Sequence, residues 1–469
     1  MTQHAVVTSA YPPRRAVVSW MLFDWASQPF FTLVTTFVFA PFFASALAST
    51  PAEGQALWGY ATGFAGLCIA FLSPVLGAIA DQAGSRKPWI ALFGSMMVAG
   101  SFVLWFTIPG TPLALPIALG GFVLAVIGAE FAALFNNAMM PTLVPPEQIG
   151  RLSGTGWAIG YLGGLLSLAL TLGFLAASPE TGKTLLGFAP AFGLDPATRA
   201  GDRFSGPLSA LWFIIFVTPM FLFVPDRPRR MALGSAVSSG LSSLAKTLKS
   251  LSGKRTLARF LLANMLYADA LVALFAFGGI YAAGAFGWGT IEIGIFGILL
   301  TVTGVFGAWL GGKLDDHLGS RIVIAVSLVI LILTCIGISG TTKDTLLFVF
   351  ASAIPTPTDG LYATAAEKGY VAMGLLIGLV AGPVQAASRS LLIKLAPQDD
   401  IGQYFGLFTL SGKVTSFIGP TLVAIVTQLF MSQRVGVVVL IIMFGLGLFL
   451  IMERASEPDH SSEPGSVNR

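Results

Sequence analysis

Two stretches decide the fold: Gly77-Ala-Ile-Ala-Asp81-Gln-Ala-Gly84-Ser85-Arg86 and Gly312-Lys-Leu-Asp-Asp316-His-Leu-Gly319-Ser320-Arg321. They share the pattern GxxxDxxGSR, with every shared residue at the same offset. Each stretch follows a long apolar run. Because so specific a charged turn occurs twice in equivalent surroundings, we infer that the chain consists of two related halves.

A second pair of stretches repeats in the same order. Leu143-Val-Pro145-Pro-Glu147-Gln-Ile149-Gly150-Arg-Leu-Ser-Gly154 matches Leu395-Ala-Pro397-Gln-Asp399-Asp-Ile401-Gly402-Gln-Tyr-Phe-Gly406. Two matches at equivalent positions predict a parallel duplication, in which the halves are related by an axis along the membrane normal.

The composition excludes a soluble protein. Of the 469 residues, only 10% are charged and 55% are hydrophobic, and the mean hydropathy is +0.82. Soluble domains carry about 25% charged residues, and disordered chains are polar and highly charged. A polytopic membrane protein remains. The net charge of +4 does not indicate a nucleic-acid partner, because the basic residues lie in short loops between apolar runs.

The apolar runs predict twelve membrane-spanning helices and therefore an all-α membrane protein. Helices are required because lipid cannot satisfy an open sheet edge, and each run can cross about 30 Å of hydrocarbon. The predicted spans are residues 17–45, 57–80, 89–108, 112–140, 152–177, 207–224, 257–284, 290–313, 321–340, 368–394, 400–430 and 435–452. Residues 345–354 are apolar but too short to span, so we expect an interfacial or re-entrant segment there.

The spans divide the chain into two parallel six-helix bundles. We expect a tail at residues 1–16, the N-terminal bundle at 17–224, a linker at 225–256, the C-terminal bundle at 257–452 and a second tail at 453–469. Within the linker, Leu241–Leu251 is compatible with an amphipathic helix on the membrane surface, with a plain linker or with a topology signal.

Positive charge predicts the orientation. Twelve spans place both termini on one side, and most Lys and Arg residues fall in the loops of that side. The exceptions are Lys183, Arg199, Arg203, Lys343, Lys368 and Arg434. The positive-inside rule therefore predicts that both termini are cytoplasmic.

The repeated turns are candidate gates. Glycine permits close helix approach and tight turns, and an aspartate at a helix end beside an arginine on the next helix can form a charge-assisted latch. The alternative is a topology-setting loop with a solvated ion pair, which stabilises little. The candidate gating residues are Gly77, Asp81, Gly84, Arg86, Gly312, Asp316, Gly319 and Arg321.

Polar and charged residues inside the spans are costly and mark candidate transport residues. Helical spacing places Asn264 and Tyr267 on one face with Asp269 offset from it, and it places Gln385 and Arg389 together. The candidates for substrate binding or proton coupling are Asp24, Glu130, Asn136, Asn137, Asn264, Tyr267, Asp269, Gln385, Arg389 and Lys413.

Two mechanisms remain open for the acidic candidates. In the first, Asp24, Glu130 or Asp269 takes up a proton on one side of the membrane and releases it on the other. In the second, these acids stay ionised and pair with Arg389 or Lys413, as structural latches or as ligands for a zwitterion. We expect no metal site, because His4, His317 and His460 lie in tails or loops.

Several segments resemble a known transporter family. The GxxxDxxGxR turn resembles the signature loop of the major facilitator superfamily, and other segments resemble its vacuolar-effluxer-like branch, which contains autophagy-related amino-acid effluxers and bacterial members. These segments are Trp20–Ser27, Gly154–Gly164, Met265–Asp269, Phe277–Gly284, Gln385–Ser390, Tyr404–Leu407 and Ser411–Lys413. The resemblance implies that the first and seventh spans line a central cavity. Tyr161 stands where the antiporter-type motif has proline, which argues against drug/proton antiport.

These observations lead to one functional hypothesis. We expect a secondary active transporter that moves a small polar, amino-acid-like solute by proton-coupled alternating access, with export favoured by the resemblance. The alternatives are an importer of peptide, sugar or cell-wall fragments, and a non-transporting receptor or assembly factor on the same fold. An enzyme is not expected, because no clustered catalytic motif is present. The expected partners are the solute, protons and the lipid bilayer, without cofactor or nucleic acid, for a monomer in a bacterial inner membrane.

Overall fold

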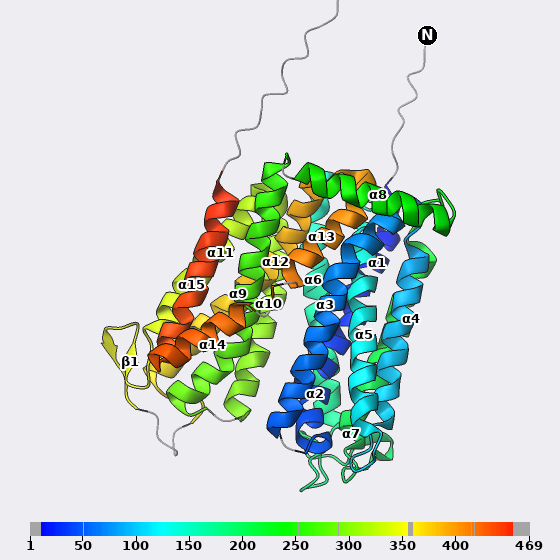
Figure 1. Cartoon of the computed structure of the whole chain (residues 1–469). Coiled ribbons are helices and arrows are strands. Elements are labelled where there is room, and N and C mark those ends of the chain that lie inside the picture. Colours follow the sequence, from blue (N-terminus) through cyan, green and yellow to red (C-terminus); the bar gives the residue numbers. More distant parts are fainter. Residues whose placement is uncertain are drawn as a thin grey trace, which may run out of the picture.

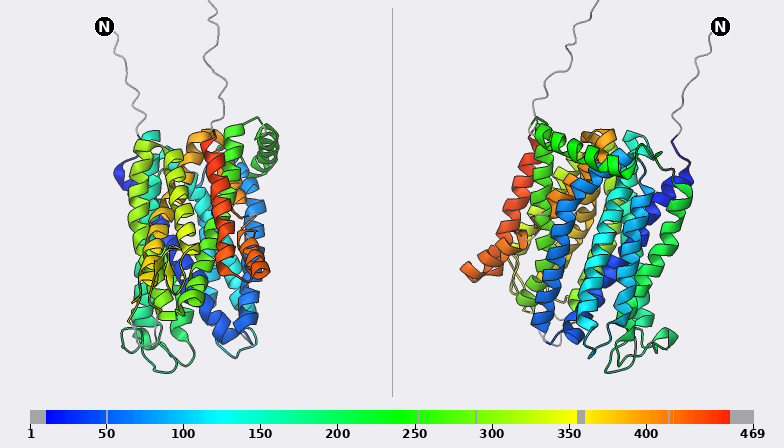
Figure 2. Two further views of the ribbon diagram at one scale, coloured as in Figure 1. Left: turned by 90° about the vertical axis from the view of Figure 1, so that its left-hand side faces the viewer. Right: turned by 45° about the vertical axis from the view of Figure 1, so that its right-hand side comes forward.

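The computed structural model describes residues 11–453, apart from residues 50, 252, 289, 355–359, 414 and 417. In this part of the chain, twelve helical segments are long and apolar enough to cross a membrane. They form an elongated bundle of nearly parallel helices (Figure 1, Figure 2). The predicted all-α membrane fold is confirmed, and each predicted span overlaps one of the twelve segments.

The N-terminal half begins with an irregular first span. Its α-helices are α1 (Arg14–Pro29), α2 (Phe39–Phe42), α3 (Pro51–Ala83), α4 (Lys87–Val103), α5 (Ala114–Asn137), α6 (Ile149–Leu170) and α7 (Ala200–Phe223). The first span continues from α1 through the π-helical segments η1 (Phe30–Phe37) and η2 (Phe43–Leu47). Proline has no N–H to donate, so one helical hydrogen bond is missing at Pro29, which explains why the helix widens after this residue. Such π-segments are frequent at functional sites.

The C-terminal half follows the linker helix α8 (Leu233–Leu251). Its helices are α9 (Arg255–Phe286), α10 (Thr290–Leu318), α11 (Ser320–Ser339), α12 (Ala365–Leu395), α13 (Ile401–Lys413), α14 (Ile418–Phe430) and α15 (Gln433–Met452). The predicted eleventh span is thus two helices, α13 and α14. The linker helix is longer than the predicted Leu241–Leu251.

Short turns and one hairpin complete the chain. The 3-10 turns are η3 (Leu104–Phe106), η4 (Met140–Thr142), η5 (Pro146–Gln148), η7 (Ala191–Gly193) and η8 (Gln398–Asp400), and the π-helical segment η6 (Thr171–Leu175) continues α6. In the segment that we expected to be interfacial or re-entrant, β1 (Thr345–Leu346) pairs antiparallel with β2 (Phe350–Ala351). The segment therefore contains a hairpin and no helix. Where α12 begins, Thr364 and Glu367 form a reciprocal capping box.

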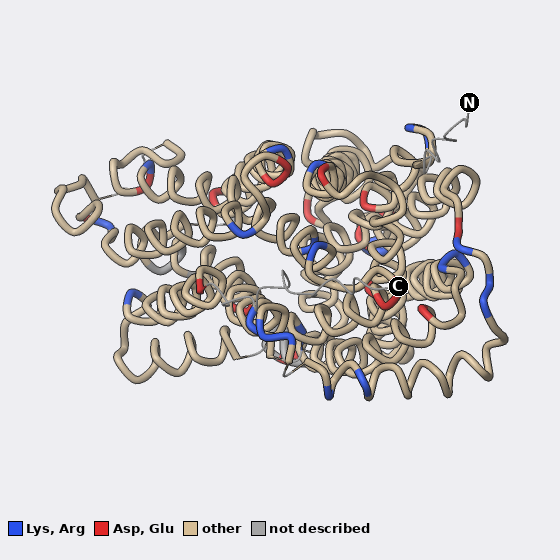
Figure 3. The backbone as a smooth tube through the Cα atoms, turned by 90° about the horizontal axis from the view of Figure 1, so that it is seen from above, with Lys and Arg blue, Asp and Glu red and all other residues tan. Residues whose placement is uncertain are grey.

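The two halves meet mainly through two helix pairs, α3 with α13 and α6 with α10, and α12 also packs on α6. Both ends of the described chain and α8 lie at one end of the bundle, which we call the terminal face (Figure 1). Charged residues are sparse along a predominantly uncharged chain (Figure 3). Each ion pair that joins the two halves is therefore a specific feature.

Candidate functional site

The first GxxxDxxGSR turn brings α3 of the N-terminal half against α13 of the C-terminal half. A Cβ atom at Gly77 would collide with the carbonyl oxygen of Gly402. One at Gly406 would lie 2.5 Å from the Cα atom of Pro74. Backbone therefore meets backbone at this crossing, and only glycine fits at these positions.

Asp81 joins the halves at the same crossing. Its carboxylate accepts hydrogen bonds from the backbone amides of Gly402 (3.0 Å) and Gln403 (2.8 Å) and pairs with Arg86. Amides in the first turn of a helix lack a partner within that helix and carry partial positive charge. Asp81 therefore caps a helix of the opposite half. Arg86, only 1% exposed, compensates the buried charge, so the expected Asp81–Arg86 pair is present.

The second turn makes a related contact with different partners. At the crossing of α10 and α6, a Cβ atom at Gly312 would lie 2.8 Å from the carbonyl oxygen of Gly150. Asp316 accepts a hydrogen bond from the Arg151 backbone amide (3.0 Å), in the first turn of α6, and its Oδ2 lies 3.4 Å from Arg151 Nε. Asp316 thus also caps a helix of the opposite half, but the cation that pairs with it, Arg151, belongs to the opposite half as well. The Arg151 side chain is 54% exposed.

The expected Asp316–Arg321 latch is not formed. Asp316 is engaged by α6, and Arg321 makes no ion pair with any described residue. The neighbouring Asp315 is buried instead, and it accepts hydrogen bonds from Ser320 Oγ (2.5 Å) and Lys394 Nζ (2.9 Å). Lys394 of α12 therefore supplies the cation within this half, where the repeat predicted Arg321.

Both turns nevertheless share one backbone feature. Gly84 has a φ of 94° and Gly319 a φ of 87°. L-residues with side chains rarely adopt this left-handed conformation. Of the four candidate gating glycines, Gly84 and Gly319 thus shape the turns, while Gly77 and Gly312 make the close helix contacts.

We call the α3–α13 contact at the first turn the first closure, and the α6–α10 contact at the second turn the second closure. The linker covers the first closure and leaves the second uncovered. Asp226 accepts hydrogen bonds from the backbone amides of Arg86 (2.8 Å) and Lys87 (3.0 Å), at the start of α4. Arg230 donates its backbone amide to Ala83 (2.9 Å), and its guanidinium lies 3.4 Å from Asp399. Residues 226–230, which we call the strap, therefore connect the halves. Burial, and then the nearby Arg86 charge, lower the pKa of Arg227 in the strap.

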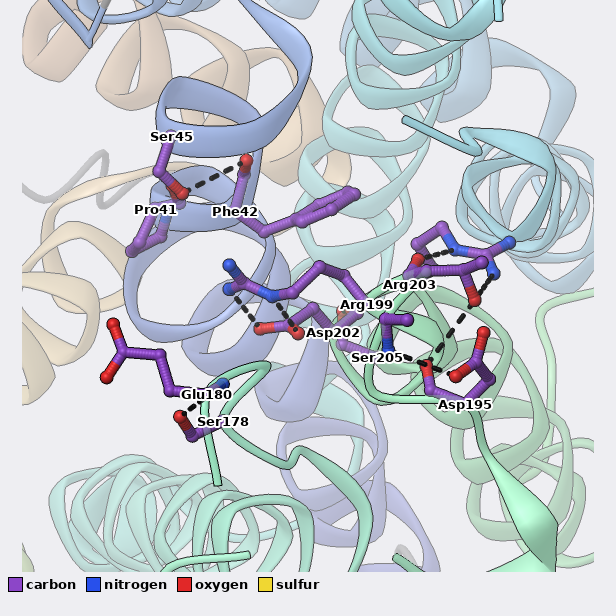
Figure 4. Close-up of polar contacts among 12 residues, drawn as sticks. Pro41, Phe42, Ser45, Ser178, Glu180, Asp195, Arg199, Asp202, Arg203 and Ser205 are labelled. Atoms are coloured by element: carbon purple, nitrogen blue, oxygen red, sulfur yellow. Dashed lines mark hydrogen bonds and ion pairs between the residues drawn. The ribbon is translucent and has the colours of Figure 1, made fainter. Parts of the chain in front are cut away.

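On the opposite face, the described residues form an ion pair that lies within the N-terminal half, between Arg199 and Asp202. Figure 4 shows Arg199 paired with Asp202 through Nε (2.8 Å) and Nη2 (3.0 Å) at the start of α7. This pairing raises the pKa of Arg199, whose guanidinium also lies 5.5 Å from the Phe42 ring centroid. Among the described residues, ion pairs that cross between the halves lie on the terminal face or in the middle of the bundle. The structure is therefore closed at the terminal face.

A polar cavity of about 370 Å³ lies between the halves. The candidate residues that line it are Glu130, Asn137, Asn264, Tyr267, Gln385, Arg389 and Lys413. Asp24, Asn136 and Asp269 lie outside this lining. Asn136 is fully buried, its side-chain amide has no hydrogen-bond partner, and its backbone oxygen accepts a hydrogen bond from Trp20 (2.7 Å).

Arg389 is the more tightly held of the two cavity cations. It donates hydrogen bonds to Ser153 Oγ (2.9 Å), to the Ser153 carbonyl (2.8 Å) and to Asn137 Oδ1 (2.8 Å). Its Nη1 also lies 3.6 Å from Asp24 Oδ2. All these partners belong to the N-terminal half, so Arg389 of α12 fastens the C-terminal half to it. Several charge-assisted bonds at one buried group form a strong network.

Lys413, the last residue of α13, has a simpler environment. Its Nζ lies 2.7 Å from Glu130 Oε1 of the N-terminal half, and the two side chains are 37% and 20% exposed. Among the described residues, this carboxylate is its one acidic partner. The pair therefore faces the cavity and can exchange partners more easily than the Arg389 network.

Asp269 has no cationic partner among the described residues. It is 2% exposed, and its Oδ1 has no hydrogen-bond partner. A Cβ atom at Gly419 would lie 2.6 Å from the Asp269 backbone oxygen, so Asp269 lies against the start of α14. Tyr267, two residues earlier, points elsewhere and bonds to Ser388 (2.6 Å). The expected offset between Asp269 and the Asn264–Tyr267 face is therefore observed.

A larger, mainly apolar cavity of about 690 Å³ adjoins the polar one. It is lined by residues of both halves, including Phe37 of η1, Tyr161 of α6 and Tyr370 of α12. Phe275 lines both cavities. A solute in the polar cavity would thus have an apolar chamber beside it.

The comparisons with known proteins agree with this arrangement. Residues 53–457 match the family described as "Vacuole effluxer Atg22 like". The chain belongs to this Atg22-like family. It is 27% identical over 437 residues to YxiO of Bacillus subtilis, described as an uncharacterized MFS-type transporter, covering 92% of this chain and 93% of that protein. It is 24% identical over 331 residues to autophagy-related protein 22 of Yarrowia lipolytica, covering 65% of this chain and half (50%) of that protein.

Solved structures show the same fold. The crystal structure of FucP, a Major Facilitator Superfamily transporter in the outward conformation, matches with a TM-score of 0.67 and 16% identity, over 93% of this chain and 97% of FucP. The human organic anion transporter MFSD10 matches with a TM-score of 0.65 and 16% identity, over 94% and 100%. This Atg22-like protein is therefore a multi-pass membrane transporter of the major facilitator type. Transporters of this type bind small-molecule substrates within a lipid bilayer.

Sequence reasoning missed the partners that belong to the opposite half. Ser153 and Arg151 of α6 hold Arg389 and Asp316, and Asp226 of the linker caps α4. Both α6 residues lie within the repeated stretch Leu143–Gly154, which was a usable signal. Asp226 stands between two prolines in an otherwise basic segment, and nothing in the spacing marks it as a cap.

Proposed function

We propose that this Atg22-like transporter exports a small amino-acid-like solute by proton-coupled alternating access. It works as a monomer in a bacterial inner membrane with both termini in the cytoplasm. Residues 17–224 and 257–452 act as the two moving bundles, and residues 225–256 form the cytoplasmic linker. In this orientation the closed terminal face is cytoplasmic, so the conformation described above faces outward.

The observation that carries the proposal is the pair of cross-half ion pairs at one cavity. Removing one partner of a partly buried pair leaves a charge uncompensated, which is unfavourable. A zwitterion brings an ammonium and a carboxylate together. It can therefore replace the Lys413–Glu130 contact without leaving either side chain unpaired, which a singly charged solute cannot do. The volume of about 370 Å³ suits a small molecule.

The surroundings of the three acids support a different role for each. Asp24 lies beside the hydrogen-bonded Arg389 network and serves as a structural link between the halves. Glu130 and Lys413 form the more accessible pair and bind the solute. Asp269, which has no cationic partner among the described residues, carries the coupling proton. A carboxyl without a nearby cation in a low-dielectric site is stable only when it is protonated or when it reaches water, so its protonation follows the conformation.

The two repeated turns act as the cytoplasmic gate in this scheme. Their glycines let the halves approach closely, and Asp81 and Asp316 stabilise the closed state by capping helices of the opposite half. Export is supported by the description of the family as effluxers. Among the solved structures of similar fold is the fucose:proton symporter of E. coli, at 16% identity; the proton role proposed for this chain rests on Asp269.

Counterflow in proteoliposomes tests the proposal. Vesicles loaded with an unlabelled amino-acid mixture should accumulate a labelled amino acid, and an imposed pH gradient should drive net movement. Lys413→Gln should abolish both activities. Asp269→Asn should keep counterflow and lose the gradient-driven movement, while Glu147→Gln, on the exposed terminal face, should change neither.

The outcomes separate the parts of the proposal. If no amino acid shows counterflow with the unaltered protein, the substrate class is wrong. If Asp269→Asn retains gradient-driven movement, Asp269 does not carry the proton.

A further inference from the structure

The linker helix α8 lies on the flank of the bundle at the terminal face. Figure 2 shows it (green) at the level of the helix ends, seen end-on beside the bundle in the left view. One side of α8 packs on α3. Ala236, Gly240 and Leu244 are buried there, and a Cβ atom at Gly240 would lie 2.9 Å from the Cα atom of Ile79. The helix therefore runs beside a membrane-spanning helix near that helix's end.

A second side of α8 is apolar, and the described part of the chain leaves it exposed. Leu233, Val237, Leu241 and Leu248 are between 38% and 53% exposed. Their spacing of four, four and seven residues places them in one stripe. Val237 and Leu241 each follow a buried residue directly, so the stripe is adjacent to the packed side. An isolated exposed leucine is unremarkable, but four in one stripe indicate an apolar environment.

The third side is polar, and the linker is strongly basic. Ser235, Ser238, Ser242 and Lys246 are exposed at helical spacing. Residues 227–255 contain no Asp or Glu, and their basic residues are Arg227, Arg229, Arg230, Lys246, Lys249, Lys254 and Arg255. A helix with one apolar and one basic polar side, lying flat, has the character of an interfacial membrane helix.

We propose that α8 is an interfacial anchor that inserts its Leu233–Val237–Leu241–Leu248 stripe into an anionic lipid leaflet. The occupant is lipid because the stripe lies beside α3 at the level where a spanning bundle must meet the headgroups. The basic linker complements a negatively charged membrane surface, which attracts Lys and Arg residues that lie close to it.

The anchor has a mechanical consequence. The strap, residues 226–230, leads directly into α8 and holds Asp399 of the other half through Arg230. An α8 helix fixed both to α3 and to lipid stays with the N-terminal half. Opening the terminal face must therefore break the strap's contacts to the C-terminal half and leave α8 in place.

Depth-dependent fluorescence quenching tests the proposal on the full chain. In a Cys68→Ala, Cys335→Ala background, single cysteines replace Val237, Leu241 or Leu248 on the stripe, and Ser238 or Ser242 on the polar side as matched controls. Each cysteine carries a small environment-sensitive fluorophore, and the protein is reconstituted into vesicles that contain phosphatidylglycerol and a lipid with a quencher on its acyl chain.

Stripe positions should be quenched by the lipid at least about twofold more than the serine positions, and iodide in water should show the reverse order. Replacing phosphatidylglycerol with phosphatidylcholine should reduce the lipid quenching at Leu241→Cys. Equal quenching on both sides of α8, or stripe positions open to iodide, would overturn the proposal. Stripe positions shielded from both quenchers would overturn it in favour of a protein partner.

Discussion

The two closures at the terminal face come from one repeated motif and differ in how they hold. Both use a glycine for backbone contact, and both use an aspartate to cap a helix of the opposite half. The α3–α13 closure buries its own cation, Arg86, beneath the strap. In the α6–α10 closure the cation is Arg151, which belongs to the N-terminal half while Asp316 belongs to the C-terminal half, and its side chain is half exposed.

The difference teaches which feature of the motif carries the contact. The shared element is the aspartate at a foreign helix N-terminus, because it is present in both halves. The arginine that follows differs: Arg86 is used, whereas Arg321 makes no ion pair with any described residue. Burial then decides the energetics, since a buried pair is costly to break while an exposed one is screened by water. We therefore expect the first closure to dominate.

Asp81→Asn should have the largest effect. The asparagine keeps the shape but removes the charge that compensates buried Arg86, whose Nε and Nη1 already lack hydrogen-bond partners. Breaking a buried pair from one side costs about 3–5 kcal/mol. The closed terminal face should lose that much stability relative to the open one, measured from the populations of the two states by spin-label distances.

A double-variant cycle separates the pair from the fold. Asp81→Asn combined with Arg86→Gln removes both charges and should recover part of the loss. If the double variant is as unstable as the sum of the single variants, Asp81 and Arg86 do not act as a pair.

Gly77→Ala should come next. The new Cβ atom would collide with the Gly402 carbonyl, whereas the matched Gly312→Ala places its Cβ atom 2.8 Å from the Gly150 carbonyl. Overpacking typically costs about 1–3 kcal/mol, so Gly77→Ala should open the terminal face more than Gly312→Ala. Cysteine accessibility on that face measures the opening, and a reversed order would contradict the comparison.

Asp316→Asn should have a smaller effect. The substitution removes a helix cap and a half-exposed pair with Arg151, which together are worth about 1 kcal/mol. High salt should weaken the Asp316 contact and leave the Asp81 contact nearly unchanged, because buried pairs are screened less. Transport rates of the unaltered protein and of Asp316→Asn at two salt concentrations test this; a salt effect equal in both would count against it.

Arg321→Gln should change little. Without an ion pair to a described residue, its removal should alter stability by no more than about 0.5 kcal/mol. Lys394→Gln is the contrasting variant, because it leaves buried Asp315 without its cation. Thermal unfolding of both variants decides the matter, and a destabilised Arg321→Gln would restore the latch that the repeat suggested.

The sequence was sufficient for the spans and for the residues of the repeat. Hydropathy located the twelve segments, and the duplicated turns pointed to Gly77, Asp81 and Gly312, which all lie at the contact between the halves. Spacing also placed Tyr267 and Asp269 on different sides of α9. These features depend on local periodicity, which a single chain displays directly.

The pairing of side chains across the halves could not be read in the same way. Whether Asp316 meets Arg321 or Arg151 depends on the packing of α6 on α10, and whether Asp24 and Glu130 meet Arg389 or Lys413 depends on the conformation of the transporter. Asn136 and Asn137 are adjacent in sequence, yet only Asn137 reaches the cavity, because a helix turns about 100° per residue. Such choices are made by tertiary contacts.

The most direct test of the unequal closures compares Asp81→Asn with Asp316→Asn by spin-label distance measurements across the terminal face. Labels replace Gln148 of the N-terminal half and Gln398 of the C-terminal half, both exposed, in vesicles without solute. A larger long-distance population for Asp81→Asn than for Asp316→Asn, with Arg321→Gln unchanged, is the predicted result. Equal populations for the two aspartate variants, or a larger one for Asp316→Asn, would contradict the account.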